Sequence, residues 1–139
     1  MLGAKTHIYT GIEQDENLLA DRIIDAAIEV HKTLGGPGLL ESLYEDALLH
    51  ELQLRNIPVQ TQVKVPVNYK NFILREPMRL DLLVAGRVII EVKATEMVQA
   101  VHRAQLLTYL RLTGLKLGLV LNFGQCRLVD GMSRVVNNL

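Results

Sequence analysis

The sequence is poor in cysteine, in long apolar runs and in net charge. Its one cysteine, Cys126, forms no internal disulfide and has no second cysteine for a metal site, which fits a reducing cytoplasm. We expect its thiol to be buried or half-buried. No apolar run approaches the roughly 20 residues that span a bilayer, and residues 1–16 lack an apolar signal segment. These absences predict a cytoplasmic protein that makes no membrane contact.

The charges balance, with fifteen Lys and Arg residues against fifteen Asp and Glu residues. A strong basic excess would indicate nucleic acid as a partner, so its absence lowers the expectation of tight, non-specific duplex binding. A nucleic-acid enzyme stays compatible with this balance, because a local basic patch can serve. A homo-oligomer is also compatible with the sequence.

Internal repeats, low-complexity tracts and Pro/Ser-rich linkers are absent too. The 139 residues, 49% of them hydrophobic, fit one globular domain with a proper core. Residues 1–16 are polar without clear periodicity and are predicted to be a loose lead-in. The single domain is therefore predicted over residues 17–139.

Hydrophobic periodicity places helices and strands in this domain. Apolar residues at spacings of three and four, followed by Gly35 and Gly36, predict a helix over the range 17–34. Further helices are predicted over the ranges 39–55 and 96–113, the latter closed by Gly114. Alternation or short apolar runs predict strands over the ranges 58–67, 72–74, 79–84, 87–93, 116–122 and 127–129. Pro66 suggests that the first strand lies at a sheet edge or contains a bulge. This order predicts an α/β fold with a mixed sheet.

One predicted hairpin, "RLDLLVAGRVIIEVK" (residues 79–93), carries charges inside apolar strands. Side chains alternate across a strand, so its apolar residues can share one face only if the loop near Gly86 is odd-numbered or bulged. The residues of this shared face are Leu80, Leu82, Val84, Val88, Ile90 and Val92. The same register gathers Asp81, Glu91 and Lys93 on the opposite face.

Two converging carboxylates repel each other unless a cation or a proton neutralises them. Lys93 is one such cation, and a divalent metal is the other option. Oxygen ligands from Asp81 and Glu91 suit Mg²⁺ or Mn²⁺. The alternative is a surface cluster of Asp, Lys and Glu on a wet sheet face, because short motifs also match by chance.

Two helices carry further candidates. Glu41 lies in the first turn of the second helix, where the helix dipole alone is a sufficient reason for an acid. In the third helix His102, Gln105 and Tyr109 share a face at spacings i, i+3 and i+7. That stripe is either half-buried polar surface or a set of residues that orients Lys93 or contacts a phosphate. His31 is interpreted as an ordinary structural or surface histidine.

Three segments carry a resemblance to a known family. "GLLESLY" (residues 38–44) is similar to the signature of the GxxExxY protein family, and "RLDLLVAGRVIIEVK" resembles the core of the PD-(D/E)XK nuclease superfamily. "AQLLTYLR" (residues 104–111) resembles the Q-x-x-x-Y element of its lambda-exonuclease-like and RecB-like branch. The resemblance covers residues 17–136. Leu80 stands where the signature has proline.

The resemblance implies a restriction-endonuclease-like αβββαβ core with an extra N-terminal helix. It also implies a metal site for Mg²⁺ or Mn²⁺ and a set of residues with roles. The implied metal ligands are Asp81, Glu91, the main-chain carbonyl of Val92, and Glu41 directly or through water. The implied catalytic residues are Glu41, Asp81, Glu91, Lys93 and Gln105, and the implied substrate contacts are Tyr109 and Tyr44.

The implied function is metal-dependent hydrolysis of DNA phosphodiester bonds. Lys93 would orient the attacking water or stabilise charge. The alternative is a catalytically silent module of nuclease fold that binds nucleic acid or a partner protein. The sequence does not distinguish DNA from RNA, exonuclease from endonuclease, or one strand from two.

Overall fold

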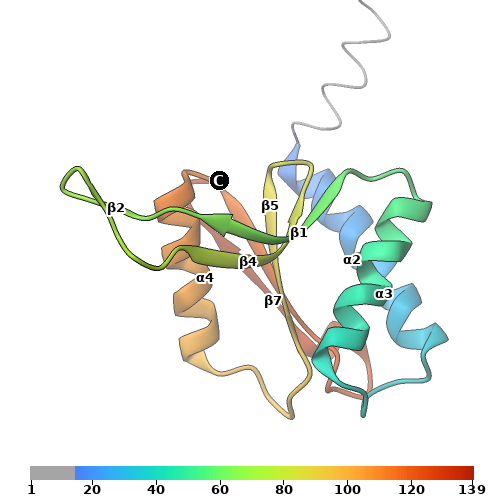
Figure 1. Ribbon diagram of the computed structural model, residues 1–139. Coiled ribbons are helices and arrows are strands. Elements are labelled where there is room, and N and C mark those ends of the chain that lie inside the picture. Colours follow the sequence, from blue (N-terminus) through green and yellow to red (C-terminus); the bar gives the residue numbers. More distant parts are fainter. Residues whose placement is uncertain (1–14) are drawn as a thin grey trace, which may run out of the picture.

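The computed structural model describes residues 15–139, with three α-helices and one main sheet (Figure 1). The helices are α2 (Glu16–Thr33), α3 (Glu41–Leu54) and α4 (Ala100–Thr113). The predicted lead-in lies almost entirely outside the described residues. Asp15 is the N-cap of α2, and its Oδ1 accepts hydrogen bonds from the amides of Asn17 and Leu18 at 2.9 and 3.2 Å. No described helix is long and apolar enough to cross a membrane.

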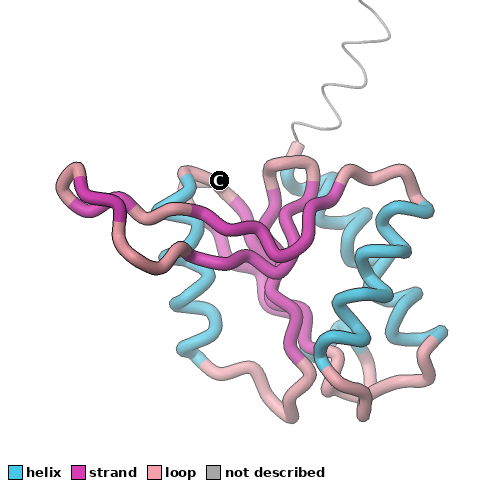
Figure 2. The backbone as a smooth tube through the Cα atoms, in the orientation of Figure 1, coloured by secondary structure: helices cyan, strands magenta, loops and turns pink. Residues whose placement is uncertain are grey.

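The main sheet has five strands in the order β1-β4-β5-β6-β7. Figure 2 shows the strands in magenta between the helices. These are β1 (Val59–Val65), β4 (Met78–Val84), β5 (Val88–Lys93), β6 (Leu117–Asn122) and β7 (Met132–Val136). Only β5 and β6 run parallel, because α4 connects them, and the other neighbours are antiparallel. β1 is an edge strand, as Pro66 predicted. A separate hairpin joins β2 (Asn68–Tyr69) to β3 (Phe72–Ile73).

The sheet is packed on both faces, with α2 and α3 on one side and α4 on the other (Figure 1). Leu82, Val84 and the apolar residues of β5 predicted to share their face do pack toward α2 and α3. The opposite face was not predicted to be covered, yet Ile89 and Val120 pack there against Leu106 and Leu110 of α4. Leu80 also belongs to the α4 side, which corrects its predicted face. The strand therefore changes its inward face between Leu80 and Leu82.

Three other predictions are wrong at the C-terminal half. The predicted strand at 127–129 is part of a 3₁₀ turn (Leu128–Gly131), and the real last strand is β7. α4 begins at Ala100 rather than at residue 96, since residues 94–99 form a loop. Cys126 is exposed rather than buried.

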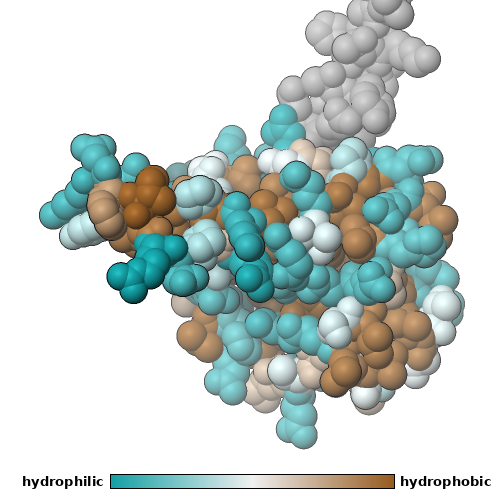
Figure 3. Space-filling model, viewed as in Figure 1, coloured by the Kyte–Doolittle hydropathy of each residue, from teal (hydrophilic) through white to brown (hydrophobic). Residues whose placement is uncertain are grey.

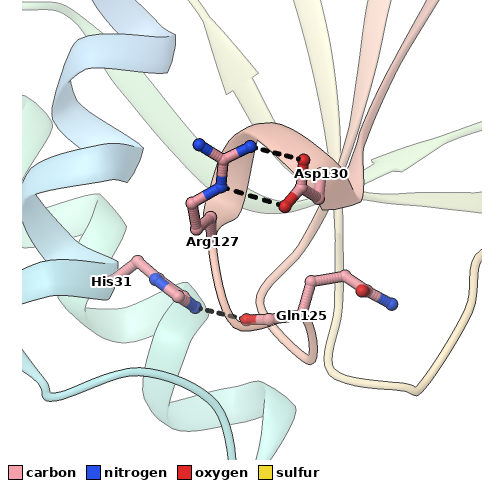
Figure 4. Close-up of polar contacts among 4 residues, drawn as sticks. All are labelled: His31, Gln125, Arg127 and Asp130. Atoms are coloured by element: carbon pink, nitrogen blue, oxygen red, sulfur yellow. Dashed lines mark hydrogen bonds and ion pairs between the residues drawn. The ribbon is translucent and has the colours of Figure 1, made fainter.

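The segment between β6 and β7 is fixed to α2 by a buried histidine (Figure 4). His31 donates from Nε2 to the carbonyl oxygen of Gln125 at 2.9 Å. Arg127 and Asp130 form a two-pronged ion pair at 3.1 Å in the same segment. His31 thus has the structural role predicted for it.

Tyr44 also has a structural role, in place of the predicted substrate contact. The side chain is fully buried and its ring stacks on Phe123, with centroids 4.7 Å apart. Its hydroxyl donates to the carbonyl of Gly36 at 2.7 Å and accepts from the amide of Leu39 at 3.1 Å. Tyr44 therefore fastens the loop between α2 and α3 to the core.

Replacing Tyr44 with phenylalanine is expected to lower the free energy of unfolding by about 1–2 kcal/mol, because two part-buried backbone groups lose their partner. Urea denaturation of both proteins measures the difference. The matched control is Tyr69→Phe, whose ring is 58% exposed and whose hydroxyl loss should change stability by less than about 0.5 kcal/mol. Equal losses in the two variants would contradict the role given to Tyr44.

Candidate active site

The central hairpin separates at the position of its two acids. A three-residue loop, Ala85–Arg87, lies between the paired residues Val84 and Val88, which confirms the predicted odd-numbered loop. Both Ala85 and Gly86 have positive φ, of 52° and 66°, as a tight turn of this kind requires. Pairing of β4 with β5 runs from this loop only as far as Leu82 and Ile90. Asp81 and Glu91 are the next residues along each strand.

Beyond Leu82 and Ile90, the side chains of the two acids accept hydrogen bonds in place of the backbone pairing between β4 and β5. The amide of Asp81 donates to Glu91 Oε2 at 3.2 Å, and the amide of Val92 donates to Asp81 Oδ2 at 2.9 Å. Each carboxylate thus takes a backbone N–H that a carbonyl of the partner strand would otherwise accept. The fold itself therefore brings the two acids together.

Burial disfavours the ionised forms of Asp81 and Glu91. Glu91 is 6% exposed, and burial, with the charge of Asp81 added, raises its pKa to about 8. Burial also raises the pKa of Asp81, while the hydrogen bond from Val92 and the charge of Lys93 lower it. Glu91 is buried and Asp81 is half-buried, unlike the side chains of a cluster on a wet sheet face.

Lys93 and Glu41 complete the predicted set from two different elements. Lys93 is half-buried at the end of β5, and its charge lowers the pKa of Asp81, Glu91 and Glu41. Glu41 is the first residue of α3; burial raises its pKa, and the charges of Asp81 and Glu45 add to that rise. One lysine therefore faces several acids, so the cluster carries an excess of negative charge.

Glu45 and Gln62 belong to the same cluster but were given no role from the sequence. Glu45 Oε2 accepts from Gln62 Nε2 at 2.7 Å and from Thr61 Oγ1 at 3.3 Å. Gln62 also lies close enough to Asp81 to lower the pKa of that carboxyl. The position of Glu45, one turn after Glu41 on the same side of a helix, was the available signal. Nothing in the alternating sequence of β1 marks Gln62.

Gln62 has an unusual backbone conformation at this point. Its φ is +50°, in the left-handed region, although it lies in the middle of a strand and is not glycine. It stands opposite Asp81, between the pairs Thr61–Leu82 and Val63–Leu80. Val63 packs on the α4 side together with Leu80, whereas Thr61 reaches Glu45 of α3. Both strands thus change face at Gln62 and Asp81, where the site is.

The predicted stripe on α4 is only partly at the site. Tyr109 is half-buried, and its pKa is raised by burial and by the charges of Glu91 and Asp81. His102 accepts from the amide of Gln99 through Nδ1 at 3.2 Å, and its charge lowers the pKa of Glu41. Gln105 is exposed, and no hydrogen bond joins it to the acids within residues 15–139. The catalytic role implied for Gln105 and the substrate contact implied for Tyr109 stay predictions.

The loop after Lys93 is held in place by a buried amide. Asn122 is fully buried; its Nδ2 donates to the carbonyl of Thr95 at 2.9 Å, and its Oδ1 accepts from the amides of Thr95 and Gly124 at 3.0 Å. Gly124 approaches Thr95 so closely that an added Cβ would lie 2.0 Å from the Thr95 carbonyl oxygen. Since Asn122 pairs with Lys93 in the sheet, these contacts fix the chain directly beyond the lysine.

The acidic pair has the chemistry that a hard divalent cation requires. Each carboxylate uses one oxygen on a backbone amide and keeps a second for another ligand. Within the described part of the chain, no three His, Cys, Asp or Glu side chains are grouped as a ready-made metal site. Mg²⁺ commonly binds through one or two carboxylates and keeps several waters. The free carboxylate oxygens of Asp81 and Glu91 therefore fit a divalent cation such as Mg²⁺ or Mn²⁺.

Comparison with known proteins gives one match. The profile of the PD-(D/E)XK nuclease superfamily matches residues 17–135, whereas no curated protein and no solved structure matches the chain. The element order agrees with this match: α3, β1, β4, β5, α4 and β6 form the αβββαβ core, and α2 is the extra N-terminal helix. Membership of the GxxExxY family and of the lambda-exonuclease-like branch stays a prediction. With most of its length matched and its fold restriction-endonuclease-like, the chain belongs to the PD-(D/E)XK nuclease superfamily.

Proposed function

We propose that the protein hydrolyses phosphodiester bonds of DNA with Mg²⁺ or Mn²⁺ as cofactor. The observation that carries the proposal is the pair Asp81 and Glu91, held together in a buried place beside Lys93. Such a pair costs free energy unless a cation or a proton is present. In a nuclease of this superfamily, the cation that offsets the repulsion between the two acids would also take part in the hydrolysis.

The residues of the cluster have separate tasks in this proposal. Bound there, a divalent cation would supply a water of lowered pKa and offset the charge of the phosphate oxygens. Asp81 and Glu91 would hold the cation, with the main-chain carbonyl of Val92 as a further oxygen ligand. Lys93 would donate a hydrogen bond to the attacking water or to a phosphate oxygen. Glu41, kept in place by α3, would bind a water of the cation.

A catalytically silent module is the competing function. It is favoured by one observation, the lack of a three-ligand group among residues 15–139. Thermal unfolding with and without Mg²⁺ or Mn²⁺ separates the two, since a ligand that binds only the folded state raises its stability. A working site should show a stabilisation that Asp81→Asn removes.

The direct test is incubation of purified protein with linear and circular DNA, single- and double-stranded, in Mg²⁺, Mn²⁺ or EDTA. We expect cleavage of at least one form that depends on the cation and is lost in Asp81→Asn. An RNA of matched sequence is included, because cleavage of RNA alone would make the protein a ribonuclease. Cleavage that persists in folded Asp81→Asn would contradict the proposed site.

A further inference from the structure

A two-stranded arm extends from the strands that carry the site. The arm consists of residues 64–79, with the β2–β3 hairpin at its tip, and it projects beyond the sheet and past α4 (Figure 1). Its turn residues Lys70 and Asn71 have positive φ, and the amide of Leu74 donates to the carbonyl of Val67 at 2.8 Å. The arm is thus a regular hairpin; Val65 at its base packs on the α4 side of the sheet, whereas every residue of its tip, 68–73, is exposed.

The tip of the arm exposes aromatic side chains. Tyr69 and Phe72 are paired across the hairpin and are 58% and 67% exposed. The other aromatic residues of the described chain, Tyr44, Phe123 and Tyr109, are buried or half-buried. Apolar surface at the tip lies beside hydrophilic surface (Figure 3). Exposed rings next to charged groups are typical of surfaces on which bases stack.

The arm also collects positive charge in a chain whose total charge is zero. It contains four basic residues, Lys64, Lys70, Arg75 and Arg79, and one acid, Glu76. The rest of the sequence therefore has eleven basic and fourteen acidic residues. The four basic side chains are exposed, and none forms an ion pair with residues 15–139. Lys70 lies over the Tyr69 ring, 5.4 Å from its centroid.

Two of these cations face each other at the base of the arm. Lys64 and Arg79 are directly paired across β1 and β4, an arrangement that like charges make unfavourable. An anion between them would remove that cost. The pair lies two residues from Gln62 and Asp81, so it stands next to the acidic cluster along both strands. The tip is seven residues from Gln62, within about 25 Å.

We propose that the arm binds an unpaired stretch of the nucleic acid on which the site acts. Phosphates would contact Lys64 and Arg79 at the base and Lys70 and Arg75 farther out, while bases stack on Tyr69 and Phe72. This inference rests on the proposed function, to which it adds the binding surface. Unpaired strands are favoured because a base in a duplex does not offer its face to an aromatic ring.

The test is the binding of a labelled single-stranded oligonucleotide in EDTA, measured by fluorescence anisotropy over a range of salt concentrations. The arm variant Lys70→Gln, Arg75→Gln, Arg79→Gln is compared with Arg22→Gln, Arg111→Gln, Lys116→Gln, which removes the same charge from exposed positions elsewhere. We expect the arm variant to bind at least about tenfold more weakly and to lower the salt slope by about 2, since each phosphate contact contributes about 0.7. The control variant should show the same salt dependence of binding as the wild-type protein.

A second variant, Tyr69→Ala, Phe72→Ala, tests the rings. It should lose about tenfold or more in affinity for single strands, with an unchanged salt slope. Circular dichroism and thermal unfolding establish that both arm variants are folded, as exposed side chains lead us to expect.

The outcomes separate the arm from the catalysis. If the arm variants bind the oligonucleotide as well as the charge control does, the proposal that the arm binds nucleic acid is wrong, even if the wild-type protein cleaves DNA. Arm-dependent binding without cleavage of any substrate would support the arm and overturn the proposed hydrolysis. If sedimentation shows that Tyr69→Ala, Phe72→Ala changes the mass of the particle while DNA affinity stays the same, the arm joins two copies of the chain and the proposal is wrong.

Discussion

Replacing Lys93 with methionine is expected to lower the rate of metal-dependent DNA cleavage by at least about 100-fold. The lost ammonium group is the positive charge that acts on Asp81, Glu91 and Glu41 alike, and methionine keeps most of its packing. Its removal also raises the pKa of Asp81, Glu91 and Glu41, since Lys93 now lowers all three. Single-turnover cleavage with saturating DNA measures the chemical step apart from binding.

The variant should keep its affinity for the divalent cation, because both carboxylates are still present. Stabilisation of Lys93→Met by Mg²⁺ or Mn²⁺ in thermal unfolding is the measurement, and Asp81→Asn is the comparison that loses cleavage and stabilisation together. Lys116→Met, an exposed lysine elsewhere, controls for the change of charge. Cleavage by Lys93→Met at the rate of the Lys116 control would remove the lysine from the mechanism.

The metal-free protein is expected to lose stability as the pH rises from about 4.5 to 8, and Glu91→Gln should abolish most of this loss. The pKa of Glu91 is raised from 4.5 to about 8 in the folded state, so the folded protein keeps a proton that the unfolded chain releases. The contribution is complete below about pH 4.5 and disappears as the pH passes through 8. Each pKa unit corresponds to about 1.4 kcal/mol, which makes the total a few kcal/mol.

Glutamine at position 91 can still accept the Asp81 amide, and it carries no charge at any of these pH values. Urea denaturation from pH 5 to 8.5 in EDTA should therefore give a nearly flat profile for Glu91→Gln, with higher stability than wild type at pH 8. Added Mg²⁺ or Mn²⁺ should restore the wild-type protein and leave the variant unchanged. The exposed Glu76→Gln is the matched control, and it should follow the wild-type profile. A wild-type profile that rises between pH 5 and 8 would show that another group dominates.

Local pattern was sufficient for the part of the site that lies on one hairpin. The apolar alternation around Gly86 required an odd-numbered loop, and that register predicts the meeting of Asp81, Glu91 and Lys93 that the structure shows. The same argument assumed regular strands, and it therefore placed Leu80 on the wrong face. The change of face needs the left-handed backbone of Gln62, which no residue pattern signals.

The remaining differences come from contacts between distant segments. α4 starts late because Asn122, 27 residues after Thr95, binds the backbone of the loop before the helix. Glu45 joins the cluster because Gln62, 17 residues away, folds onto it. The last strand was not predicted because β7 has only five residues, whose burial alternates between exposed and half-buried, and because its one pairing partner in the sheet is β6. Sequence periodicity describes the neighbours of a residue along the chain, and these features depend on neighbours in space.

Where β4 and β5 separate, two backbone amides donate to side-chain carboxylates instead of to backbone carbonyls, and this has a spectroscopic consequence. The amide protons of Asp81 and Val92 point at one oxygen of each carboxylate that is proposed to hold the cation. Their nuclear magnetic resonances depend on the charge of those oxygens, and so they register each proton or ion that arrives there. Two backbone amides of this protein therefore report on the state of its own site, and they can be observed without substrate or substitution.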